Sequence, residues 1–190
     1  MNKGVFAKFG IILCAVFFIV PIALSSPPSI QKDRNNIEGW QGWPMVGEAE
    51  LSVFVFDIYR STLFTPSGKY LPQGVNEPLA LSITYLRDIS STKLLEATAE
   101  QWQKLGFNQQ QVSSWIPVLE GIFPDVEPGD TLTYLSQGKY GHFIFKPKNQ
   151  AQESVGDIDN QELSQAFLSI WLSPNTTYPK LRKQLIGEQK

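Results

Sequence analysis

The chain has 190 residues, of which 42% are hydrophobic and 18% charged, and its formal net charge is −2. This length suits one domain with a sizeable core, and the charge balance gives no basic surface for nucleic acid. The single cysteine and single histidine, Cys14 and His142, exclude a disulfide framework, a zinc site and an iron–sulfur cluster. We therefore expect no metal and no cofactor. Catalysis by a nucleophile with a histidine base would have to use His142.

The first 26 residues have the pattern of a secretory signal peptide. Lys3 and Lys8 precede an apolar stretch over residues 9–24. Small residues then precede a cleavage point near Ser25. We expect residues 1–25 to be removed and the protein to be exported. The alternative is an uncleaved anchor, because about 16 apolar residues fall just short of the roughly 20 that span a bilayer. We expect membrane contact only through such a leader.

The first half of the remaining chain predicts strands. Residues 26–45, rich in proline and polar side chains, predict an extended lead-in to a domain over residues 46–190. Residues 48–64 are rich in Val, Phe, Ile and Tyr and predict a long strand or a hairpin, which a turn at residues 66–68 follows. Residues 79–87 alternate between apolar and small polar side chains, which predicts a further strand.

Helical spacing then replaces alternation. Apolar residues recur at three- and four-residue intervals over residues 94–105 and again over residues 112–122. Residues 131–145 predict another hairpin, and residues 161–172 and 179–186 predict two more helices. Strands and helices do not alternate regularly. This order therefore favours an α+β fold, with helices packed on one face of an antiparallel sheet.

Two arginines continue apolar faces of the predicted strands. Arg60 shares the parity of Phe56 and Ile58, so it ends an apolar face unless a bulge intervenes, and Arg87 shares the parity of Ile83 and Tyr85. An arginine in such a place either extends its head to the rim of the sheet, pairs with an internal acid, or holds the anionic group of a ligand. The candidate ligand site is therefore Arg60 or Arg87, with Tyr59 or Tyr85, around the carboxylate of an apolar ligand.

Other chemistry-bearing residues have simpler explanations. His142 lies in a predicted strand without an identifiable partner, and a strand histidine explains it better than a general base. The acidic residues at 125, 127 and 130 do not have the spacing of a calcium loop. Ser90 precedes a helix and is expected to cap it. No catalytic residue can be assigned from these patterns.

Five stretches together resemble the bacterial exported branch of the chalcone isomerase-like family. They are residues 46–51 leading to Ile58-Tyr59, residues 81–89, Leu105-Gly106, residues 123–130, and residues 167–172 with residues 181–187. The resemblance implies an open-faced sandwich, a large antiparallel sheet with helices on one face and a ligand cleft between them. It also implies a bacterial host, so that export would place the protein in the periplasm. In plant enzymes of the family the cleft closes a chalcone to a flavanone, and in related plastid proteins an arginine and a tyrosine hold a fatty-acid carboxylate there.

The residues that carry the family's isomerase chemistry do not match in this chain. By the resemblance, the catalytic tyrosine falls near Ser90 and the strand threonine near Phe54, and no basic residue lies between Arg34 and Arg60. We therefore expect a non-catalytic protein that binds a fatty acid or another apolar carboxylate. One alternative is an intramolecular lyase or isomerase acting on an unknown substrate. Another is a structural protein of the cell envelope without a ligand. The patterns leave the oligomeric state open.

Overall fold

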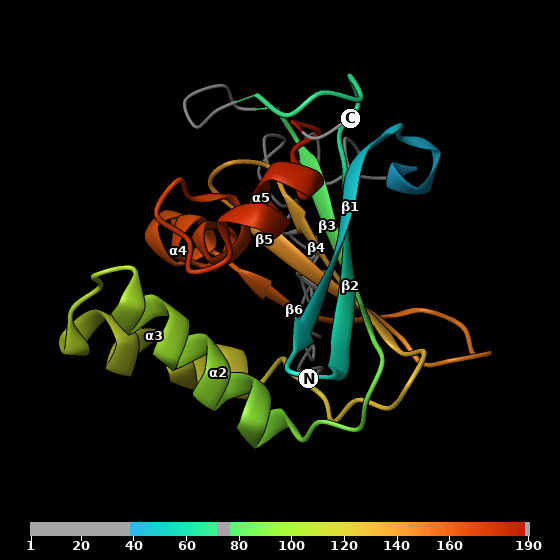
Figure 1. Ribbon diagram of the computed structural model, residues 1–190. Helices are drawn as coiled ribbons and strands as arrows, with labels where there is room; N and C mark the ends of the chain where they lie inside the picture. Colours follow the sequence, from blue (N-terminus) through green and yellow to red (C-terminus); the bar gives the residue numbers. More distant parts are fainter. Residues whose placement is uncertain (1–38, 72–76, 189–190) are drawn as a thin grey trace, which may run out of the picture.

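A six-stranded antiparallel sheet, with its strands in the order β1-β2-β3-β4-β5-β6, organises residues 39–71 and 77–188, which are the residues that the structure describes. The structure is a computed structural model (Figure 1). The elements are η1 Trp40–Gly42, β1 Met45–Val53, β2 Phe56–Phe64, β3 Leu79–Tyr85, α2 Ser91–Lys104, α3 Gln109–Glu120, β4 Thr131–Ser136, β5 Gly141–Lys146, β6 Glu153–Ile158, α4 Gln161–Leu172 and α5 Pro179–Leu185.

Each strand pairs with the next strand in the chain, and α2 and α3 are inserted between β3 and β4. The helices lie on one side of the sheet in Figure 1, and we call the surface that they cover the helix face. The expected α+β fold with an antiparallel sheet is therefore confirmed. Residues 48–64 form a hairpin and not one long strand, because β1 and β2 pair along their length.

The strand β6 was not expected from the sequence. Its six residues, ESVGDI, contain a glycine and three polar or charged side chains, and only Ile158 is fully buried. Without apolar alternation, a strand is specified by its neighbour, and here β5 supplies the pairing partner.

Aromatic side chains form the centre of the core between the sheet and α4. The ring of Phe167 lies 4.8 Å from that of Tyr134 and 5.1 Å from that of Phe143, measured between centroids. The Tyr134 hydroxyl donates to Ser164 Oγ at 2.7 Å, and Trp102 Nε1 of α2 donates to the carbonyl of Ala166 at 2.8 Å. These buried hydrogen bonds fix α2 and α4 relative to the sheet, because an unpaired polar group would be costly there.

Hydrogen bonds and a glycine define the two ends of α2. Ser90 Oγ accepts from the backbone N–H of Lys93 at the start of α2, as expected. Asp125 Oδ1 accepts from the N–H of Ser91 at 2.7 Å. Gly106, with a φ of +90°, follows the end of α2, a conformation that glycine adopts without strain.

The predicted signal peptide and most of the lead-in lie outside the described residues. Of the lead-in, Trp40 packs edge-on against Phe64 with ring centroids 5.8 Å apart. Within the described ranges, no helix has the length and hydropathy of a membrane span.

Candidate functional site

The face that each β2 side chain occupies is set by a bulge near the β1–β2 turn. Leu51 pairs with Tyr59 but Ser52 pairs with Asp57, so Ile58 is an extra residue in β2. Beyond this bulge Tyr59 lies on the helix face, where its hydroxyl meets α4, and Arg60 lies on the opposite face.

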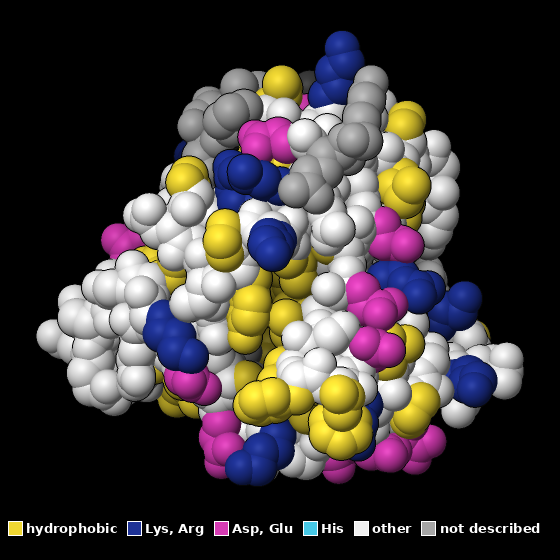
Figure 2. Space-filling model, viewed as in Figure 1, with side chains coloured by type: hydrophobic (Ala, Val, Ile, Leu, Met, Phe, Trp, Pro, Cys, Tyr) yellow, Lys and Arg dark blue, Asp and Glu magenta, His cyan; other side chains and the backbone are white. Residues whose placement is uncertain are grey.

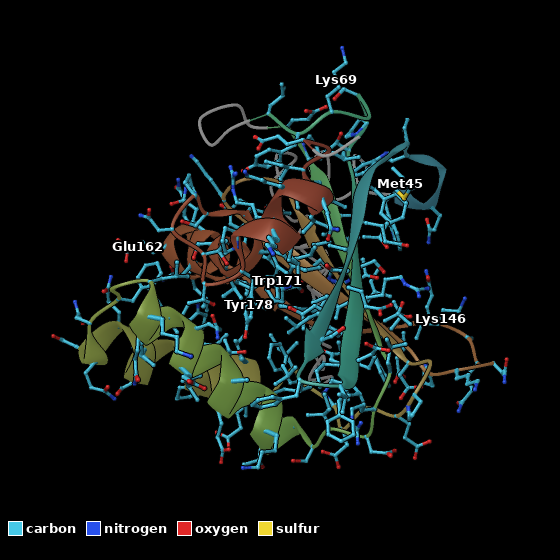
Figure 3. The ribbon with its side chains drawn as sticks, in the orientation of Figure 1. Met45, Lys69, Lys146, Glu162, Trp171 and Tyr178 are labelled. Carbon is cyan, nitrogen blue, oxygen red and sulfur yellow. The ribbon has the colours of Figure 1, made fainter. Side chains whose placement is uncertain are left out.

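A cluster of aromatic side chains with polar atoms lies between this part of the sheet and the C-terminal helices. Trp171 Nε1 of α4 donates to the Tyr59 hydroxyl at 3.0 Å, and Tyr59 is the cross-strand neighbour of Tyr85. Trp171 and Tyr178, which directly precedes α5, lie close together between the helices and the β1–β2 hairpin (Figure 3). Figure 2 shows a hollow lined by hydrophobic side chains in the same region. We call this hollow the cleft.

The tyrosine hydroxyls of the cluster are neutral hydrogen-bond donors. Burial raises the pKa of Tyr59 and of Tyr85 above the ordinary value of 10, and each hydroxyl therefore keeps its proton at any physiological pH. The Tyr59 oxygen accepts from Trp171, so its own proton remains available to a ligand. The Tyr85 hydroxyl has no hydrogen-bond partner in the described part of the chain. Two hydroxyls thus offer protons inside an otherwise apolar region.

Arg87 supplies a cation beside the β1–β2 turn. It follows Tyr85 by two residues, and its guanidinium carbon lies 4.6 Å from the ring centroid of Phe56. Among the described residues it pairs with no carboxylate. The contact with Phe56 holds the charge at the hairpin end of the cleft without neutralising it.

Arg60 does not belong to the cluster. It bonds to Glu50 at 3.1 Å and lies 3.7 Å from Glu48, and both glutamates are on the face opposite the helices. The expectation that Arg60 continues an apolar face is wrong, because the bulge at Ile58 reverses the alternation between Phe56 and Arg60.

His142 has a partner that the sequence did not identify. Its Nδ1 lies 2.6 Å from Asp157 Oδ1, across the β5–β6 pair. No hydroxyl hydrogen-bonds the ring within the described residues. The arrangement is a cross-strand pair of half-exposed side chains and lacks a nucleophile.

The acidic loop after α3 has a structural explanation. Asp130 is buried, and its carboxylate accepts from the backbone N–H of Glu127 at 2.9 Å and of Lys148 at 2.8 Å. The described residues contain no group of three or more potential metal ligands. The loop is therefore held by its own carboxylate.

The sequence analysis missed Trp171 and Tyr178 as members of the site. Trp171 lies within the helix predicted over residues 161–172 and was not chosen as a site residue, and Tyr178 falls in a short connection before Pro179. The hydrogen bond between Trp171 and Tyr59 joins positions 112 residues apart in the chain. The only local signal was an indole at the end of an apolar helix, because a buried indole N–H needs an acceptor.

Comparison with known proteins identifies a family, a relative in sequence and a solved structure with a similar fold. The family model described as chalcone isomerase-like matches residues 47–187. An uncharacterised protein from Haemophilus influenzae is 32% identical over 149 residues, which cover 78% of this chain and 70% of that protein. The fold resembles that of a fatty-acid binding protein from Arabidopsis thaliana, with a TM-score of 0.52 and 10% identity over 76% of this chain and 86% of the other.

Proposed function

Because the chain belongs to the chalcone isomerase-like family, we propose that it binds a fatty acid or another apolar carboxylate in the cleft between the sheet and the helices. The observation that carries this proposal is the pair of tyrosine hydroxyls, Tyr59 and Tyr85, which offer protons inside an apolar region with Arg87 at its end. The similarity in fold to a fatty-acid binding protein supports the same class of ligand.

The chemistry of the cluster suits one anionic group on a long apolar body. An ionised carboxylate is costly to bury unless it is hydrogen-bonded and paired. Hydroxyl donors and a guanidinium together meet both needs, and the guanidinium can leave the Phe56 ring to reach a bound anion. Partly buried apolar side chains, among them Leu51, Leu94 and Leu95, pack beside the core and would contact the alkyl chain.

The two positions that the family resemblance links to isomerase chemistry have other roles in this protein. Ser90 caps α2 through its hydroxyl, and Phe54 lies in the β1–β2 turn with 97% of its surface exposed. Neither side chain supplies a proton-transfer group to the cleft. We therefore propose binding without catalysis.

A displacement titration tests the carboxylate site. We expect oleate to displace a fluorescent long-chain fatty acid, and oleate methyl ester to do so much more weakly. Tyr85→Phe removes one hydroxyl and keeps the ring, and we expect it to weaken oleate binding about fivefold to tenfold. Arg87→Gln should weaken it by about tenfold or more.

Arg60→Gln is the matched control, because it also removes a guanidinium, but one that lies on the face of the sheet opposite the helices. Oleate affinity should then be unchanged. If the ester binds as tightly as the acid, or if the three variants behave alike, the proposed carboxylate site is wrong.

We also propose that the protein is exported, on the basis of the basic and apolar pattern of residues 1–26. The mass of the protein recovered from a periplasmic fraction tests this: a chain that begins near Ser26 is expected. The full-length mass in a membrane fraction would instead indicate the anchor.

A further inference from the structure

The turn between β1 and β2 exposes four consecutive apolar side chains, which we call the apolar tip. The exposed fractions are 41% for Val53, 97% for Phe54, 85% for Val55 and 52% for Phe56. The other large apolar side chains that are exposed in the described ranges are single residues: Met45, Leu71, Val118 and Tyr140. Single exposed apolar residues are normal, but a contiguous patch usually marks an interaction site.

The residue at the first position of the turn is not the one that its backbone conformation favours. Phe54 has a φ of +56°, whereas Val55 is not among the residues with positive φ. This sign pattern is that of a type II′ turn, in which the first position favours glycine. A bulky aromatic residue in this conformation is strained, and glycine would form the turn more easily and leave less apolar surface in water.

The size of the tip favours a lipid surface over a second protein. With about 200 Å² for a phenylalanine side chain and roughly 150 Å² for a valine, the four exposed fractions amount to on the order of 500 Å². A stable protein interface buries about 800 Å² on each partner. A narrow convex loop with two or three apolar side chains is, in contrast, sufficient to enter the interfacial region of a bilayer.

Arg87 gives the tip a charge that complements lipid. Its guanidinium lies against Phe56 and forms no ion pair with the described residues, so it can meet a lipid phosphate while the ring beneath it contacts acyl chains. We propose that the apolar tip inserts into the surface of a phospholipid bilayer, with Arg87 at the level of the phosphates. The sequence alone had suggested membrane contact only through the leader.

The position of the tip gives this contact a use. Phe56 is three residues before Tyr59, and Figure 2 shows hydrophobic side chains gathered at the turn of the hairpin, continuous with the cleft. Insertion would hold the end of the cleft against the lipid, and an apolar ligand could pass between bilayer and cleft without entering bulk water. This last step rests on the proposed function, whereas the insertion itself does not.

A tryptophan placed at the tip reports insertion directly. Phe54→Trp is compared with Val118→Trp, which puts the same reporter at an exposed apolar position of α3. The full chain is mixed with phosphatidylcholine–phosphatidylglycerol vesicles that carry brominated acyl chains. We expect quenching and a blue shift of the added tryptophan in Phe54→Trp only. Equal responses of the two variants would overturn the proposal, whatever contact residues 1–26 make.

A second pair of variants tests the energetic contribution of the tip. The double variant Phe54→Gly/Val55→Ser relieves the strain of a bulky residue at positive φ and removes apolar surface from the tip. It should lower the vesicle partition coefficient at least about tenfold relative to Val118→Ser. An unchanged coefficient together with equal quenching contradicts insertion. If the coefficient is unchanged but quenching is selective, the tip inserts and other residues also hold the protein.

Two further measurements distinguish the alternatives. A dimer in sedimentation velocity that Phe54→Gly/Val55→Ser converts to a monomer, without selective quenching, would assign the tip to a second copy of the chain. The same variant should keep its affinity for oleate in solution, because it changes neither the tyrosines of the cleft nor Arg87 and the Phe56 ring beneath it. A loss of vesicle binding with oleate affinity retained therefore separates this inference from the proposed function.

Discussion

Replacing Gly47 by alanine should separate α5 from the sheet. Gly47 lies in β1, and a Cβ built on it would overlap the backbone carbonyl oxygen of Gln184 and lie 2.7 Å from that of Leu185. An ordinary contact begins at 3.4 Å, so α5 would have to withdraw by at least about 0.7 Å. Both obstacles are backbone atoms and cannot rotate away. Overpacking of this kind costs about 1–3 kcal/mol, and we expect a loss near the upper end in the free energy of unfolding.

Urea unfolding followed by tryptophan fluorescence measures this change. Gly42→Ala is the control, because its added Cβ would meet nothing within 4 Å, and it should change the free energy of unfolding by less than about 0.5 kcal/mol. Oleate binding by Gly47→Ala should also weaken, since Tyr178 directly precedes the displaced helix. If the two alanine variants are equally stable, the close approach of α5 to β1 is wrong.

The remaining predictions concern charged and buried polar groups. Arg60→Ala should lower the free energy of unfolding in urea by no more than about 1 kcal/mol, because its ion pairs with glutamates are about half exposed. Asp130→Ala should cost about 1–3 kcal/mol in the same assay, because two partly buried backbone N–H groups lose their charged acceptor, whereas Glu127→Ala should be nearly neutral. Burial raises the pKa of Tyr85 and of Tyr134 above 10, so both stay protonated in the folded state where the unfolded chain ionises. Stability is therefore fully present below pH 10 and should fall above it by about 1.4 kcal/mol per pH unit for each tyrosine; no loss between pH 10 and 11 would contradict their burial.

Local patterns were sufficient for most of the fold. The helix α4 spans Gln161–Leu172, as its apolar spacing predicted, because a buried helix with a polar start and a following proline is marked at both ends. The alternation in residues 79–87 similarly predicted β3 and the face of Tyr85. These elements carry their own pattern of burial. The strand β6 does not, because its pairing with β5 and not its side chains determines its conformation.

The candidate site was only partly predictable for the same physical reason. Tyr85 follows from an uninterrupted strand, where parity alone assigns a face, whereas Arg87 lies two residues beyond the end of β3. Trp171 and Tyr178 reach the site through tertiary packing of α4 and α5, which no short window of sequence encodes.

The bulge at Ile58 links the error about Arg60 to the proposed roles of the hairpin. Without it, Phe56 and Ile58 would share the face of Arg60, opposite Tyr59 and the helices. With it, the same strand presents Tyr59 to the cleft and Phe56 to Arg87. One extra residue therefore brings an apolar turn and a hydrogen-bond donor to the same end of the cleft. Bulges that redirect side chains are over-represented at sheet edges and next to active sites, and this one places Tyr59 and Phe56 where the proposed functions need them.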